Sequence, residues 1–223
     1  MNIYRLLARL LIYPDSDAQA ALPAIRERLL ADPAIPSRLR RDLGHALDEL
    51  ASADPLELQE RYSGMFDRIR SLSLHMFEHV HGDSRERGPA MLDLVALYRR
   101  HGLDVTAGEL PDYLPLFLEF LSTIERAEAD RYLADAADIL GALHDRLSKR
   151  QSPYAAIFAV LLHLARAPAT PLAEEQEELS FAALDRAWEE AAVAFGPENN
   201  PTTSGGCDRA AAMVARMNAV PRE

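Results

Sequence analysis

The chain has 223 residues and a formal net charge of −11; 48% of its residues are hydrophobic and 26% are charged. This composition is typical of a globular protein and not of a disordered one. The acidic charge argues against a nucleic-acid partner, because binding to a phosphate backbone needs a basic surface. The single cysteine, Cys207, excludes an intramolecular disulfide and any metal site that needs several cysteines.

No stretch of the sequence is long and apolar enough to span a membrane. The longest apolar run, 155–165, has 11 residues and contains His163, whereas a bilayer needs roughly 20. Arg5 and Arg9 interrupt the apolar pattern of the N-terminus, which also lacks a small-residue cleavage site. The N-terminus therefore predicts a structured helix and not a secretion signal. We expect a cytoplasmic protein without stable membrane insertion.

The first third of the chain predicts four helices. Apolar residues recur at helical spacing from Ile3, and Pro14 ends this first helix. A second helix is expected over about 17–31, and Ser37 is expected to cap a third. An Asp-Pro pair, a common helix start, opens a fourth helix over about 54–69.

The rest of the chain continues the helical pattern up to residue 166. Helices are expected over about 86–100, 113–122, 125–150 and 153–166, with a loop at 105–112. No alternating strand pattern, hairpin signal or internal repeat is present. We therefore expect an all-α fold of roughly nine or ten helices, with a single helical-bundle domain over 1–166. The composition changes from residue 167, and we expect 167–223 to hold a linker, an acidic helix and a flexible C-terminal tail.

The segment SLSLHMFEHVHGDSRERG (71–88) is the densest in groups that can do chemistry. His75, Glu78 and His79 match the H-x-x-E-H pattern of inverted zinc peptidases. On a helix, the two histidines would share a face and could bind Zn²⁺, with Glu78 as the base. The alternative, which we favour, is that His79 and His81 cap or hydrogen-bond the end of a helix that runs into Gly82, while Met76, Phe77 and Val80 pack inward. That interpretation needs no metal.

A second segment, GELPDYLPLFLEFL (108–121), holds two prolines around an apolar stretch. It predicts either a buried helix with an irregular start or a hinge or groove wall. The overlapping region from Asp104 to Asp145 holds ten acidic and only two basic residues. Such a region is often no more than a solvated face. Beside an apolar groove, it would favour a basic, amphipathic peptide.

The run LQERYSGMFDRIRSLSLHMFEHVHGDSRERGPAMLDLVALYRRHGL, followed by ELPDYLPLFLEFL, closely resembles the NarJ family. These proteins are the assembly chaperones of respiratory nitrate reductase and belong to the TorD-like group. The resemblance implies an all-helical, cytoplasmic protein that is not an enzyme and holds no cofactor. It implies that the protein binds the N-terminal, leader-like segment of the nitrate reductase alpha subunit, NarG. Binding would keep the apoenzyme competent for molybdenum cofactor insertion before it docks at the membrane.

The resemblance also implies which residues contact the partner. The family's second motif maps onto 109–113, where Tyr113 stands in place of an expected histidine. The zinc-dependent peptidase that uses His75, Glu78 and His79 is kept as the alternative function. The residues expected to contact the partner are Tyr62, Phe66, His75, Phe77, Glu78, His79, His81, Arg85, Glu109, Pro111, Asp112, Tyr113, Leu114 and Phe117.

Overall fold

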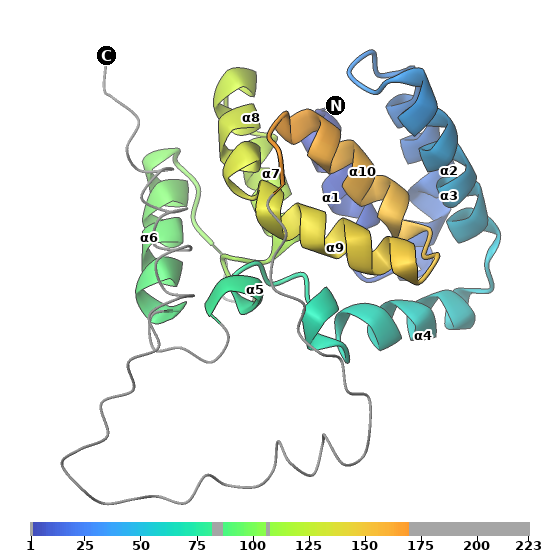
Figure 1. Cartoon of the computed structure of the whole chain (residues 1–223), viewed down its shortest axis with the longest axis horizontal. Helices are drawn as coiled ribbons and strands as arrows, with labels where there is room; N and C mark the ends of the chain where they lie inside the picture. The colour runs from blue at the N-terminus through green and yellow to red at the C-terminus, as the bar shows by residue number, and fades with distance from the viewer. Residues whose placement is uncertain (1, 82–86, 106–107, 170–223) are drawn as a thin grey trace, which may run out of the picture.

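The computed structural model describes residues 2–81, 87–105 and 108–169, and for His81 only the backbone. Within these ranges the secondary structure is helical, apart from one isolated bridge between two loop residues, so the predicted all-α fold is confirmed (Figure 1). The helices are α1 (Ile3–Leu10), α2 (Ser16–Ala31), α3 (Ser37–Ser52), α4 (Pro55–Phe66), α5 (Glu78–His81), α6 (Arg87–Arg100), α7 (Leu114–Leu121), α8 (Arg126–Asp135), α9 (Ala137–Lys149) and α10 (Tyr154–Ala165), with a 3-10 turn at Arg70–Leu72. The predicted acidic helix and C-terminal tail lie outside the described residues.

The helix starts follow from local capping chemistry. The side chain of Asn2 accepts the backbone N–H of Tyr4 at the start of α1. The side chain of Asp54 accepts the N–H groups of Leu56 and Glu57, so the predicted start of α4 is confirmed. These bonds satisfy backbone donors that have no partner within the first turn of a helix.

Three local predictions are wrong. Ser37 does not cap α3, because its own backbone is already helical. The helix predicted over 54–69 ends at Phe66, and Ile69 adopts an extended conformation before the 3-10 turn. The helix predicted over 125–150 is two helices that meet at Ala136, where the backbone leaves the α conformation.

The core is built around α10. This helix carries apolar residues on nearly every side, and it contacts α3, α8 and α9 at the centre of the bundle (Figure 1). The apolar face of α1 packs on α7, and α2 packs on α3. No helix of the described ranges combines the length and the apolar character that crossing a bilayer requires.

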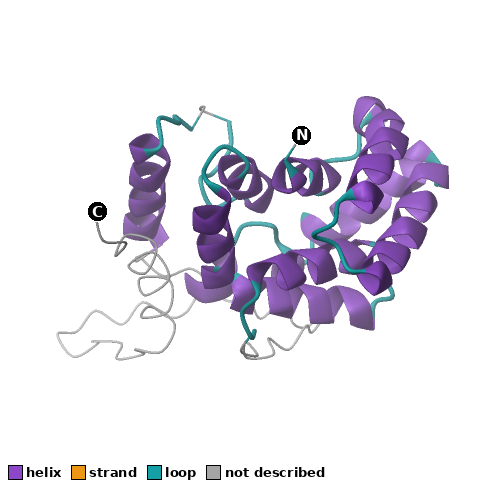
Figure 2. Ribbon diagram, turned by 90° about the horizontal axis from the view of Figure 1, so that it is seen from above, coloured by secondary structure: helices purple, strands orange, loops and turns teal. Residues whose placement is uncertain are grey.

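Helix α6 stands at one side of the molecule in both views (Figures 1 and 2). The Tyr98 side chain attaches it to the bundle in two ways. Its ring lies 4.8 Å from the ring of Phe120, and its hydroxyl donates to the backbone oxygen of Pro111 at 2.7 Å. The position of α6 therefore depends on the segment that carries the second motif.

Replacing Leu7 by alanine tests whether α1 is part of the core. Leu7 is completely buried in the helix that packs on α7. Leu7→Ala should lower the free energy of unfolding by about 2–5 kcal/mol, through lost burial and the cavity left behind. Urea denaturation measures this change. Arg9→Ala, on the exposed face of the same helix, is the control, and an equal loss in both variants would contradict the packing of α1.

Candidate functional site

The two sequence motifs meet as a pair of adjacent backbone segments. His75 and Tyr113 form an isolated antiparallel bridge. Beside it, the N–H of Leu114 donates to the oxygen of Leu74 at 2.8 Å, and the N–H of Met76 donates to the oxygen of Asp112 at 3.0 Å. Residues nearly 40 positions apart in the sequence are thereby held side by side.

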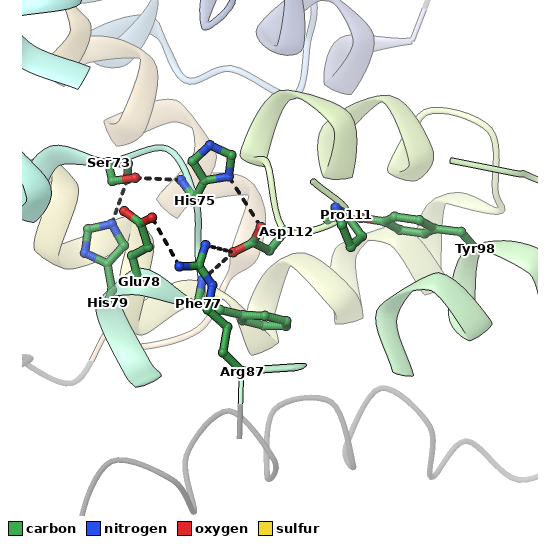
Figure 3. A network of polar contacts seen from close by, with 9 residues as sticks. All are labelled: Ser73, His75, Phe77, Glu78, His79, Arg87, Tyr98, Pro111 and Asp112. Carbon is green, nitrogen blue, oxygen red and sulfur yellow. Dashed lines mark hydrogen bonds and ion pairs between the residues drawn. The ribbon is translucent and has the colours of Figure 1, made fainter. Parts of the chain in front are cut away.

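The carboxylate of Asp112 lies at the centre of this junction (Figure 3). Its exposed fraction is 0%, so its charge must be compensated by other groups of the protein. One oxygen, Oδ2, accepts the backbone N–H of Phe77 at 3.1 Å and lies 3.7 Å from Nη2 of Arg87. The other, Oδ1, lies 3.3 Å from Nδ1 of His75. Three separate groups thus converge on one buried carboxylate.

Arg87 connects this junction to a second carboxylate. Its Nη1 donates to Oε1 of Glu78 at 3.3 Å, while its Nη2 faces Asp112 (Figure 3). Arg87 begins α6 and Glu78 begins α5. The two ion pairs therefore fix the start of α6 against both motif segments.

His75 is positioned by its carboxylate partner and by an aromatic neighbour. The hydrogen bond to Asp112 raises the pKa of His75, and the negative charges of Asp112 and Glu78 act in the same direction. Burial and the charge of Arg87 oppose them. The imidazole also lies against the ring of Tyr113, with ring centroids 5.3 Å apart. His75 thus supplies an imidazole beside the position where the family pattern expects one.

His79 has a different role from the one predicted. Its Nε2–H donates to the backbone oxygen of Ser73 at 2.7 Å, and its Nδ1 lies 3.4 Å from Nη1 of Arg146, which can only donate. Both ring nitrogens of His79 therefore face groups outside α5. The oxygen that His79 binds lies before α5 and not at its end, so the predicted helix-end contact is wrong for His79. The side chain of His81 lies outside the described residues.

The geometry behind the zinc-peptidase alternative is also wrong. α5 begins only at Glu78, so His75 and His79 do not share the face of one helix. The guanidinium of Arg146 beside His79 disfavours a second cation at that nitrogen. Across the described part of the chain, no group of three His, Cys, Asp or Glu side chains is placed to hold a metal ion.

A cleft of about 550 Å³ opens beside this junction and brings together five of the predicted contact residues. They are Tyr62, Phe66, His75, Glu78 and Tyr113. The hydroxyl of Tyr62 donates to the oxygen of Leu11 at 2.7 Å and lies 3.5 Å from that of Tyr113. Burial raises the pKa of both phenols, which therefore remain neutral. The cleft joins an aromatic surface to a set of polar groups.

Three arginines of the cleft are absent from the residues expected to contact the partner. Arg68 and Arg70 follow α4, and Arg87 begins α6. The sequence shows these basic residues in DRIR and in RERG. Both basic runs are visible in the sequence, but nothing in either run indicates that their arginines lie at one cleft.

The other predicted contact residues lie elsewhere. Phe77, Pro111, Asp112, Leu114 and Phe117 are buried and do not line the cleft. Glu109 is exposed at the start of the second motif. Arg85 lies outside the described residues.

Most carboxylates of the acidic stretch 104–145 have local roles. Asp112 is buried, as described above. Glu125 caps α8, and Asp130 pairs with Arg126 at 2.5 Å. The stretch therefore offers less free negative surface than its net charge suggests.

An apolar groove of about 320 Å³ lies beside two exposed carboxylates, Glu119 and Asp104, and Asp104 pairs with Arg99 at 3.1 Å. Leu116 and Phe120 contribute apolar side chains, and Asp104, Glu119 and Arg5 contribute charged ones. Asp104 and Glu119 are exposed. The groove is a second candidate surface for a basic, amphipathic segment.

Titration of His75 tests the junction. By NMR, the pKa of His75 should lie above the ordinary value of about 6.5 and should fall in Asp112→Asn, because an amide carries no charge to stabilise the imidazolium. Because the folded-state pKa is raised, the contact stabilises the protein fully at pH values below 6.5. That stabilisation is lost as the pH rises through the folded-state value. An unchanged pKa in the variant would show that Asp112 does not hold the imidazole.

Comparison with known proteins agrees with the motifs. A family model described as the nitrate reductase delta subunit matches residues 15–160, which include both motifs. The chain is 43% identical over 196 residues to the nitrate reductase molybdenum cofactor assembly chaperone NarJ of Escherichia coli strain K12, covering 85% of this chain and 83% of the relative.

Two further relatives have the same description. The probable chaperone NarW of the same strain is 38% identical over 208 residues, covering 89% of this chain and 86% of the relative. The probable chaperone NarJ of Bacillus subtilis strain 168 is 35% identical over 160 residues, covering 70% and 84%. Because the family model spans more than half of the chain and the relatives match along most of their length, the chain belongs to the NarJ family of nitrate reductase molybdenum cofactor assembly chaperones.

Proposed function

We propose that this chain binds the N-terminal, leader-like segment of the nitrate reductase alpha subunit, NarG, and keeps the apoenzyme competent for molybdenum cofactor insertion before membrane docking. It acts in the cytoplasm and catalyses no reaction. The description of its relatives as assembly chaperones for this enzyme supports the proposal. The observation that carries the location is the gathering of five predicted contact residues at one cleft.

The aromatic side of the cleft is suited to receive apolar side chains of the leader. The rings of Tyr62 and Phe66 lie 4.9 Å apart, and the ring of Phe66 meets that of Tyr154 edge-on at 5.1 Å. These contacts hold the surface in one conformation, so binding would cost little side-chain entropy. Tyr113 is only partly buried and can still contact a peptide.

The charges of the cleft favour one orientation of a basic leader. Asp67 is exposed at the cleft, whereas Glu78 is already paired with Arg87. Basic residues of the leader are therefore expected near Asp67 and away from the arginines. Asp112 and the buried residues behind it position this surface without contacting the peptide.

Calorimetry with a synthetic peptide of the NarG N-terminus tests the proposal. The wild-type chain should bind, and Tyr113→Ala should weaken binding at least about tenfold, as expected for an aromatic anchor at an interface. Leu56→Ala is the control, since Leu56 is 75% exposed and lies on α4 outside the cleft.

Two results would contradict different parts of the proposal. Absence of binding by the wild-type chain would overturn the function itself. If Tyr113→Ala binds normally and Leu116→Ala does not, the leader lies in the acid-rimmed apolar groove. The proposed location would then be wrong while the function stands.

A further inference from the structure

Within the described part of the chain, no other helix packs along α6. It stands at one side of the molecule in both views (Figures 1 and 2). At its start, Arg87 pairs with Glu78. At its end, the ring of Tyr98 meets that of Phe120. A helix of 14 residues gains most of its stability from packing on other elements, so we expect a further element against α6.

One side of α6 is apolar and open. The side that carries Leu94 and Tyr98 is buried. Leu92, Val95 and Ala96 lie at i, i+3 and i+4 and share another side of the helix. Leu92 is 71% exposed, Ala96 is also exposed, and Val95 is half-buried. An exposed leucine with apolar neighbours on the same side is typical of a contact surface.

The chain beyond the described residues holds a segment of matching character. Its apolar residues recur at alternating spacings of three and four, at Phe181, Leu184, Trp188, Ala191 and Phe195. This spacing predicts a helix with one apolar seam, suited to packing along another helix. The segment 181–195 has 15 residues and α6 has 14, so the two helices would be of nearly equal length.

Charged residues at the edges of the two surfaces are complementary. Arg99 and Arg100 are exposed at the end of α6. Arg99 pairs with Asp104, but an exposed pair of this kind is weak enough to exchange partners. In the segment, Asp185 and Glu189 each follow a seam residue, so they share one flank of the seam. Opposite charges beside an apolar contact favour the pairing of the two surfaces.

The described chain ends where this segment can reach α6. Ala169 packs at Gly141 of α9, where a Cβ atom added to the glycine would lie 2.6 Å from that of Ala169. Eleven residues separate Ala169 from Phe181. Fully extended, they span about 40 Å, roughly the diameter of a domain of this size.

We propose that residues 181–195 dock as a helix along α6, with Trp188 against Leu92. The docked segment covers the apolar side of α6 and gives this helix the neighbour that the described part of the chain lacks. The acidic helix expected from the sequence then belongs to the folded domain. Because Arg87 begins α6 and lines the cleft, the segment also supports one wall of the cleft.

The fluorescence of Trp188 tests the docking in the full chain. Trp188 is the only tryptophan, so the emission reports one position. In the wild type, the emission should lie at shorter wavelength than that of a solvent-exposed tryptophan and should resist quenching by acrylamide. Leu92→Glu should move it to longer wavelength and make quenching more efficient, because a carboxylate is costly to bury among apolar side chains.

Leu56→Glu is the matched control and should leave the emission unchanged. Leu56 is 75% exposed on α4, and polar residues lie three and four positions after it. The proposal is overturned if Trp188 has the emission of an exposed tryptophan in the wild type. It is also overturned if Leu92→Glu and Leu56→Glu give the same emission.

Dilution separates docking within one chain from association of two copies. If 181–195 docks on its own α6, the emission should be the same at all protein concentrations. A move to longer wavelength on dilution would show that Trp188 is buried between two copies, which contradicts the proposal.

Hydrogen exchange measures the same contact from the side of α6. In Trp188→Ser, the amides of 92–98 should exchange faster than in the wild type, while those of α10 stay protected. Trp188→Phe keeps an apolar ring and should stay close to the wild type. Equal protection of 92–98 in Trp188→Ser and in the wild type would show that another element covers α6.

Discussion

A fully buried carboxylate holds together the part of the molecule that we assign to function. Asp112 accepts the backbone N–H of Phe77 and lies beside the imidazole of His75 and the guanidinium of Arg87. Removing an ionised group from water costs free energy unless such partners surround it. The segments that carry these partners are therefore held in one arrangement, and the cleft exists because of it.

The junction around Asp112 also positions the elements on either side of it. On one side, Arg87 fixes the start of α6, whose other end is attached through Tyr98 to the oxygen of Pro111, next to Asp112 in the chain. On the other side, the paired backbone segments place His75 against Tyr113 at the cleft. His75 and His79 thus hold segments of the site in place through their hydrogen bonds.

Much of the helical framework could be predicted from the sequence, because helix periodicity and caps are local properties. Ile3 and its apolar neighbours predicted α1, and Asp54 with Pro55 predicted α4. The break at Ala136 was missed because the surrounding ADAAD carries neither proline nor glycine, and the packing of α8 and α9 around α10 accompanies it.

The site was harder to predict, because it depends on contacts between distant residues. The spacing of His75 and His79 fits a helix, but the bridge to Tyr113 keeps His75 extended. No local pattern shows that Arg87 lies at the same cleft as Arg68. The family, in contrast, was identifiable from the sequence, because the signature is long enough to be specific.

Amide hydrogen exchange at Phe77 tests the role of the buried carboxylate most directly. The bond from this N–H to Asp112 belongs to no helix, and it depends entirely on the carboxylate. The account predicts slow exchange in the wild-type chain, comparable with that of the Met76 and Leu114 amides in the same junction. It also predicts fast exchange at Phe77 in Asp112→Ala under conditions where the amides of α10 stay protected. If Phe77 exchanges rapidly in the wild type, or remains protected in the variant, Asp112 does not organise the site.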